Sequence, residues 1–87
     1  MSFIELFNKI QNIVNEYDPM HLIKCGAPED EYLPEVGQIF EYKRLNQNIQ
    51  KEKFIENIKL IFIESFNANY EINEDQFNEM AIKIMNV

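Results

Sequence analysis

The sequence predicts an all-α fold, a small compact bundle of four main helices plus one short helix at residues 19–25, in a single helical domain over residues 1–87. Three observations lead to this fold class. A chain of 87 residues with 46% hydrophobic and 26% charged residues has a globular composition and the length of one small domain. It contains only two glycines, which is few for the tight turns of an all-β fold. Most of its apolar residues recur at helical spacing.

The first predicted helix runs from about Phe3 to Tyr17. Ser2 followed by Glu5 has the pattern of a capping box, in which the Ser hydroxyl accepts a hydrogen bond from the first turn. The apolar stripe that follows consists of Phe3, Leu6, Phe7, Ile10, Ile13, Val14 and Tyr17.

The dipeptide Asp18-Pro19 is expected to end this helix and to begin the short one. Pro19 disfavours the helical conformation at Asp18. Asp is a favoured N-cap and Pro is favoured at the first helical position. Gly26 suits the left-handed residue that ends a helix. The sequence therefore predicts a helix over residues 19–25 with Asp18 as its N-cap.

A third helix is predicted from Tyr32 or Pro34 to Leu45, after an acidic loop over residues 27–31. Its apolar stripe consists of Tyr32, Val36, Ile39 and Phe40.

The fourth predicted helix begins near residues 48–50 and ends at about Asn67. Its main stripe consists of Phe54, Ile55, Ile58, Ile61, Phe62 and Phe66. Leu60 and Ile63 lie off this stripe, so we expect the helix either to be central or to carry an exposed apolar patch. A strand over residues 60–63 is the alternative, but the helical pattern extends beyond both of its ends.

A turn at residues 67–71 precedes a fifth predicted helix. Asn73 is its expected N-cap, Gln76 is the partner in the capping box, and Ile72 is expected to pack against Phe77. We expect one core to bury residues from all four main helices together: Phe7, Ile10, Val14, Ile39, Phe40, Ile58, Ile61, Phe62 and Phe77.

Charge and cysteine content limit the function classes. The net charge of −7 disfavours nucleic acid and anionic lipid and favours a basic partner. Cys25 is the only cysteine, which excludes an intramolecular disulfide and a zinc site built on several cysteines. The longest apolar run, residues 60–63, is too short to span a bilayer. Residues 1–5 lack the basic and apolar regions of a signal peptide, so we expect a cytoplasmic protein without membrane contact.

His21 and Cys25 are four residues apart, a spacing that can hold a metal on a helix. Zinc needs a fuller set of ligands than these two residues. We therefore expect His21 to lie on the surface, Cys25 to be a small buried residue, and the protein to hold no metal or cofactor.

The densest acidic cluster consists of Glu29, Asp30, Glu31 and Glu35. The calcium-loop pattern with its central Gly is absent, and nothing nearby resembles a substrate cradle for an acid/base pair. Two interpretations stay open: the carboxylates stabilise the start of the third helix through its dipole, or they bind a partner. Tyr32 adjoins them and can pack its ring inward while offering its hydroxyl.

Two segments have the pattern of a known motif set: Asp18-Pro19…Leu22…Gly26-Ala27-Pro28-Glu29-Asp30-Glu31-Tyr32…Glu35 and Ile61-Phe62-Ile63-Glu64-Ser65-Phe66. On these residues the chain resembles a family of uncharacterised bacterial proteins, domain of unknown function 1871 (YugE-like). The resemblance implies a small all-helical fold, no established activity, and structural roles for Asp18, Pro19, Gly26 and Pro28.

The chain also departs from the family's pattern. Tyr17 and Ser65 stand where the family has Trp, and Leu33 stands where it has an Asp that caps the helix, so Asp30 is expected to cap instead. Similar motifs occur in small bacterial proteins proposed as immunity partners of toxins.

The leading hypothesis is a non-enzymatic acidic protein-interaction module, in its most specific form an immunity protein that covers the basic surface of a toxin. The expected partner-binding residues are Glu29, Asp30, Glu31, Tyr32 and Glu35. The alternatives are a self-associating structural protein that uses Leu60 and Ile63 and, least favoured, a metal-dependent enzyme that uses His21 and Cys25.

Overall fold

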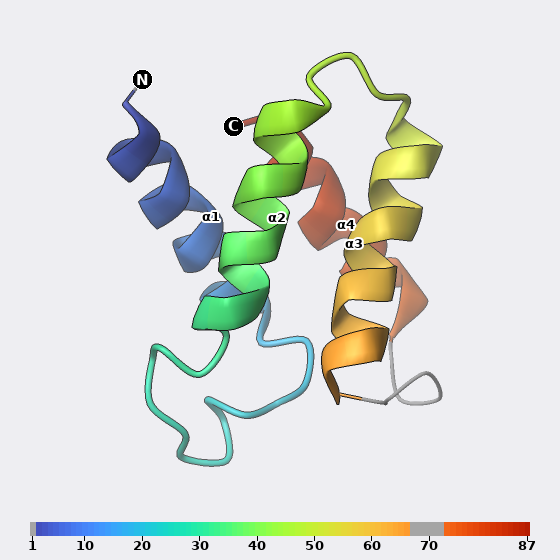
Figure 1. The fold of residues 1–87 in the computed structure, drawn as a ribbon. Helices are drawn as coiled ribbons and strands as arrows, with labels where there is room; N and C mark the ends of the chain where they lie inside the picture. Colours follow the sequence, from blue (N-terminus) through green and yellow to red (C-terminus); the bar gives the residue numbers. More distant parts are fainter. Residues whose placement is uncertain (1, 67–72) are drawn as a thin grey trace.

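Four α-helices follow one another along the chain, as the computed structural model in Figure 1 shows for residues 2–66 and 73–87, the part that it describes. They are α1 (Phe3–Tyr17), α2 (Leu33–Leu45), α3 (Lys51–Phe66) and α4 (Glu74–Met85). The all-α fold class with four main helices is therefore confirmed, and the described residues contain no strand.

Of the predicted side-chain caps, those at Ser2 and Asn73 are confirmed. The Ser2 hydroxyl accepts a hydrogen bond from the backbone N–H of Glu5 at 3.2 Å. The side chain of Asn73 accepts one from the backbone N–H of Gln76 at 3.1 Å. Each bond satisfies a backbone donor that a helix start leaves without an intrahelical partner.

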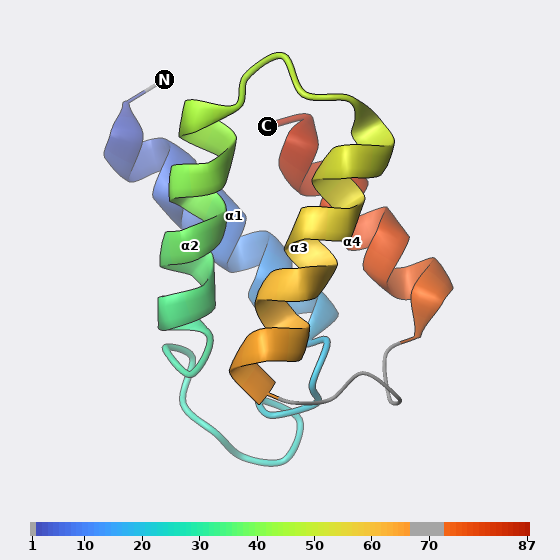
Figure 2. The same ribbon diagram turned by 45° about the vertical axis from the view of Figure 1, so that its right-hand side comes forward.

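The helices form an up-down bundle in which each packs against two neighbours. The principal pairs are α1 with α2, α2 with α3, α3 with α4, and α4 with α1. In Figure 2, α2 and α3 lie in front of α1 and α4. Both termini and the connection from α2 to α3 lie at one end of the bundle, whereas the connection from α1 to α2 lies at the other (Figure 1).

One hydrophobic core joins the four helices and the residue before α2. Its buried members are Ile10, Val14, Tyr32, Val36, Ile39, Phe54, Ile58, Phe62, Phe77, Met80, Ala81 and Ile84. Six of the nine residues predicted to be buried together are in this set, and Phe7, Phe40 and Ile61 pack against it partly buried. The predicted helix registers therefore place the correct faces inward.

The short helix predicted at residues 19–25 is wrong, because residues 19–26 form successive turns. Asp18 and His21 have positive φ angles of 48° and 58°, a left-handed conformation that interrupts a right-handed helix. Gly26 has the expected positive φ, 101°, although the helix that it was expected to end is not formed. The chain here wraps around the Asp18 side chain instead of coiling about a helix axis.

Two predicted details near the fifth predicted helix lie outside the described residues. These are the turn at residues 67–71, of which the structure describes none, and the packing of Ile72 against Phe77.

Replacing Phe62 with alanine tests the core. Phe62 is completely buried, and its ring lies edge-to-face against Phe77 with centroids 5.6 Å apart. Because such a truncation typically costs about 3–5 kcal/mol, we expect Phe62→Ala to lower the free energy of unfolding in urea by that amount. Leu60→Ala on the same helix is the control, because Leu60 is 43% exposed. It should cost about 1 kcal/mol or less. Equal losses would contradict the register of α3.

Candidate functional site

The side chain of Asp18 organises the connection between α1 and α2. Its backbone N–H ends α1 by donating to the carbonyl of Val14 at 2.7 Å. Its carboxylate then accepts hydrogen bonds from the backbone N–H groups of Ile23 at 3.2 Å and Lys24 at 2.9 Å. Asp18 is 9% exposed, so these donors replace most of the water that the carboxylate would otherwise bind.

Asp18 is thus a hydrogen-bonded centre for the turns and not the helix N-cap that the sequence predicted. An N-cap carboxylate accepts from the second or third helical residue. Here the donors are the N–H groups of Ile23 and Lys24, five and six residues further along the chain. Asp18 therefore acts on a loop longer than the first turn of a helix.

Tyr32 connects this centre to the core. Its hydroxyl donates to Asp18 Oδ1 at 2.5 Å and accepts from the backbone N–H of Met20 at 3.0 Å. Its ring has no exposed surface and lies edge-to-face against Phe62 and Phe66, with centroids 6.0 Å apart in each pair. One side chain therefore ties the loop after α1 to the packed interior.

The environment fixes the protonation of this pair. Burial by itself raises the pKa of the Asp18 carboxyl, but the hydrogen bonds from Tyr32, Lys24 and Ile23 outweigh it and hold that pKa below its ordinary value of 3.8. Burial, and then the hydrogen bond to Asp18, raise the pKa of Tyr32 above its ordinary value of 10.0. At neutral pH the pair is therefore an ionised carboxylate that accepts a hydrogen bond from a neutral phenol.

The acidic ledge, which we define as Glu29, Asp30 and Glu31, is carried by the same loop. All three residues are exposed. The side-chain amide of Asn15 donates to the backbone carbonyl of Glu29 at 2.9 Å, and the backbone N–H of Glu31 donates to the carbonyl of Pro28 at 3.1 Å. The first bond holds the backbone of the ledge to α1, the second closes a turn within the loop, and the three carboxylates remain exposed to solvent.

The other two residues of the predicted binding surface are not exposed. Tyr32 is completely buried and Glu35 is only 5% exposed, so neither belongs to an exposed face with the acidic ledge. Glu35 lies in the first turn of α2, where the helix dipole favours a negative charge. Its Oε1 atom has no hydrogen-bond partner among the described residues.

The prediction that Asp30 caps α2 is also wrong. Tyr32 occupies the N-cap position, and no side chain caps the helix. Asp30 contributes its backbone carbonyl to the N–H of Leu33 at 3.0 Å, but its carboxylate does not cap.

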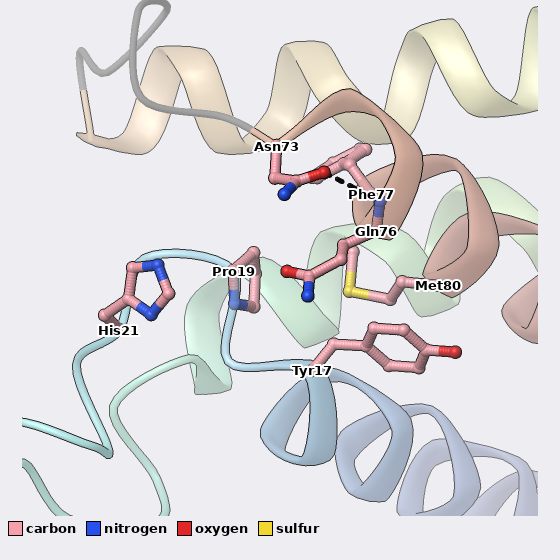
Figure 3. Close-up of a pocket in the computed structure, with 7 residues that line it drawn as sticks. All are labelled: Tyr17, Pro19, His21, Asn73, Gln76, Phe77 and Met80. Atoms are coloured by element: carbon pink, nitrogen blue, oxygen red, sulfur yellow. Dashed lines mark hydrogen bonds between the residues drawn. The ribbon is translucent and has the colours of Figure 1, made fainter.

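His21 and Cys25 do not form a site together. Both are exposed, which confirms the surface position expected for His21 and makes the burial expected for Cys25 wrong. His21 lines a pocket with Tyr17, Pro19, Asn73, Gln76, Phe77 and Met80, whereas Cys25 does not (Figure 3). The pocket has a volume of about 20 Å³, room for little more than one water molecule.

The metal interpretation gains no support from the arrangement of possible ligands. Within residues 2–66 and 73–87, no group of three or more His, Cys, Asp or Glu side chains is placed to hold a metal ion.

Other surface features bear on the remaining predictions. Leu60 is 43% exposed while Ile63 is partly buried, so only the first offers a freely exposed apolar side chain for self-association. None of the described helices has the length and apolar character to cross a membrane.

Sequence reasoning did not identify Asn15 or the pairing of Asp18 with Tyr32. Asn15 is not part of the apolar stripe of α1, and nothing in its spacing indicates a bond to a carbonyl 14 residues away. Asp18 and Tyr32 both belong to the segment that resembles a family motif, which is the one signal that links them.

The first prediction for this site concerns the Tyr32 hydroxyl. Tyr32→Phe leaves the ring in the core but removes a donor from Asp18 and an acceptor from Met20. Leaving such buried groups unpaired typically costs about 1–3 kcal/mol, which urea unfolding should detect. Tyr42→Phe is the control, because within the described residues the Tyr42 hydroxyl makes no hydrogen bond. A loss no larger than that of the control would contradict the assigned bond.

The second prediction concerns pH. Because the pKa of Asp18 is lower in the folded protein than its ordinary value of 3.8, its ionised form stabilises the fold above that value. This contribution is lost as the pH falls through the folded pKa. We therefore expect the stability advantage of the wild type over Asp18→Asn to be constant from neutral pH to about 5 and to shrink below that.

Urea unfolding at a series of pH values measures this advantage directly. Asp30→Asn serves as the control for the loss of one exposed negative charge. An advantage over Asp18→Asn that stays constant down to pH 2 would show that the carboxylate is not the stabilising group.

Comparison of the chain with family models, with curated proteins and with solved structures yields no match to any of them. The resemblance to domain of unknown function 1871 therefore stays a prediction.

Proposed function

We propose that this protein is a non-enzymatic interaction module that presents the acidic ledge to a basic protein partner. The observation that carries the proposal is the anchoring of the ledge. Asn15 holds the carbonyl of Glu29, and the bond between Asp18 and Tyr32 holds the loop to the core. Charges on a preorganised backbone lose less entropy on binding than charges on a flexible one.

Electrostatics support a cationic partner. The chain has a net charge of −7, and the acidic ledge concentrates three exposed carboxylates in consecutive residues. Opposite charges on two proteins steer their encounter and raise the association rate. Leu33 follows the ledge closely and is 42% exposed, so an apolar contact is available beside the charges.

The most specific form of the proposal is an immunity protein that covers the basic surface of a toxin in the cytoplasm. It rests on the family resemblance together with the acidic surface. A toxin gene next to the gene for this protein would support it.

Self-association is the second candidate function. One observation favours it: Leu60 is 43% exposed on α3. Because Ile63 beside it is partly buried, the apolar area on offer is smaller than the sequence suggested.

The test compares two double variants with the same net charge. Glu29→Lys with Glu31→Lys reverses the ledge, and Glu52→Lys with Glu56→Lys reverses two exposed carboxylates on α3. Each variant and the wild type are used to capture proteins from an extract of the source cells. We expect a basic protein to be retained by the wild type and by the α3 variant but not by the ledge variant.

Association rates with that purified partner, measured across a salt series, give the size of the electrostatic contribution to binding. We expect the ledge variant to associate at least about tenfold more slowly and with a flatter salt dependence. Both variants should unfold within about 0.5 kcal/mol of each other, because the changes are on the surface. Equal binding by the two variants, or no basic protein captured by the wild type, would contradict the proposal.

A further inference from the structure

A groove is lined by residues from the first turns of α1, the end of α2, the α2–α3 connection, the start of α3 and the end of α4. These segments lie at the end of the bundle opposite the connection from α1 to α2, as Figure 1 shows. Its volume is about 320 Å³. Its apolar walls are formed by Phe3, Leu6, Ile49, Phe54 and Met85. A volume of about 300 Å³ or more with mainly apolar walls is typical of sites for small molecules.

The charged side chains of this groove are both cationic. Lys43 and Arg44 line it, and no Asp or Glu is among the described residues that do. Within the described residues only Lys43 of the two lacks a carboxylate partner, so it carries the unpaired positive charge of the groove in a chain whose net charge is −7. Arg44 is held in place, since its guanidinium pairs with Glu41 at 2.8 Å and lies 5.8 Å from the centre of the Phe3 ring.

Lys43 has spare capacity for an anion. Its Nζ donates to the backbone carbonyl of Met85 at 2.8 Å, and no carboxylate lies within ion-pair distance of it in the described part of the chain. An ammonium has three N–H donors, so this one bond leaves two of them for water or a ligand. Burial lowers the pKa of Lys43, which an anion close by would offset.

We propose that this groove binds a small apolar carboxylate, with the carboxylate at Lys43 and Arg44 and the hydrocarbon chain along Phe3, Leu6 and Ile49. The charge of the groove selects an anion, and its apolar walls select a hydrocarbon chain over a hydrophilic anion. This binding site is independent of the acidic ledge and goes beyond the proposed protein-interaction function.

Three probes with the same eight-carbon chain separate charge from apolar contact. Octanoate, 1-octanol and octylammonium are titrated into the ¹⁵N-labelled protein below the concentrations at which they form micelles, and amide chemical shifts are followed by NMR. We expect octanoate to shift the amides of residues 43–49 with about tenfold higher affinity than 1-octanol, equivalent to about 1.4 kcal/mol. Octylammonium should bind more weakly than 1-octanol.

Substitutions locate the two parts of the site. Lys43→Gln should lower the affinity for octanoate toward that for 1-octanol and leave the latter unchanged, while Lys53→Gln on the exposed face of α3 should change neither. Phe3→Ala should weaken all three probes, and because Phe3 is 64% exposed this variant keeps the test available if Lys43→Gln fails to fold. Equal affinities for octanoate and octylammonium, or unchanged octanoate binding by either groove variant, would overturn the proposal. Lys43 would then serve only to bind the end of α4.

Discussion

The hydrogen bond between the Tyr32 hydroxyl and the Asp18 carboxylate is the contact on which the arrangement of the α1–α2 connection depends. It joins the two ends of a loop that contains two left-handed non-glycine residues, Asp18 and His21. Such a backbone is unfavourable by itself and needs surrounding contacts to hold it. The buried Tyr32 ring supplies them, because it places the hydroxyl from within the packed core. The conformation of the loop is therefore stabilised by its contact with the core and not by the backbone preferences of its own residues.

This dependence explains which features could be predicted from the sequence. The helices α1 and α4 begin at local signals, the side chains of Ser2 and Asn73, and each acts within one turn. The inward faces follow from apolar spacing, a second local signal. Both kinds of information are complete within a short window of sequence, so the four helices and most of the core were predicted correctly.

The sequence predicted the candidate site incorrectly where the contacts join residues far apart in the chain. Asp18 looked like an N-cap because Asp-Pro precedes many helices. In the structure its shortest hydrogen bond is to a phenol 14 residues away, and its other two side-chain bonds come from backbone N–H groups five and six residues further along the chain. The Tyr32 ring packs inward as expected, but its hydroxyl, which was expected to be offered to a partner, donates to the buried Asp18 carboxylate instead. Glu35 lies on the face of α2 that packs inward. Its position in an acidic cluster of the sequence did not indicate this burial. Exposure of a polar residue depends on distant partners that spacing does not reveal.

The acidic ledge and the groove lie at opposite ends of the bundle, and their charged side chains have opposite signs. At the α1–α2 end, backbone hydrogen bonds hold the acidic ledge, and its carboxylates contribute little to the fold. At the other end, Lys43 and Arg44 both hold structural contacts and border an apolar groove. A charge change on the ledge therefore alters recognition with little effect on folding, whereas a change at Lys43 also removes a bond to the end of α4. Since distant sites without shared partners act additively, a ligand at either end can be studied without disturbing the other.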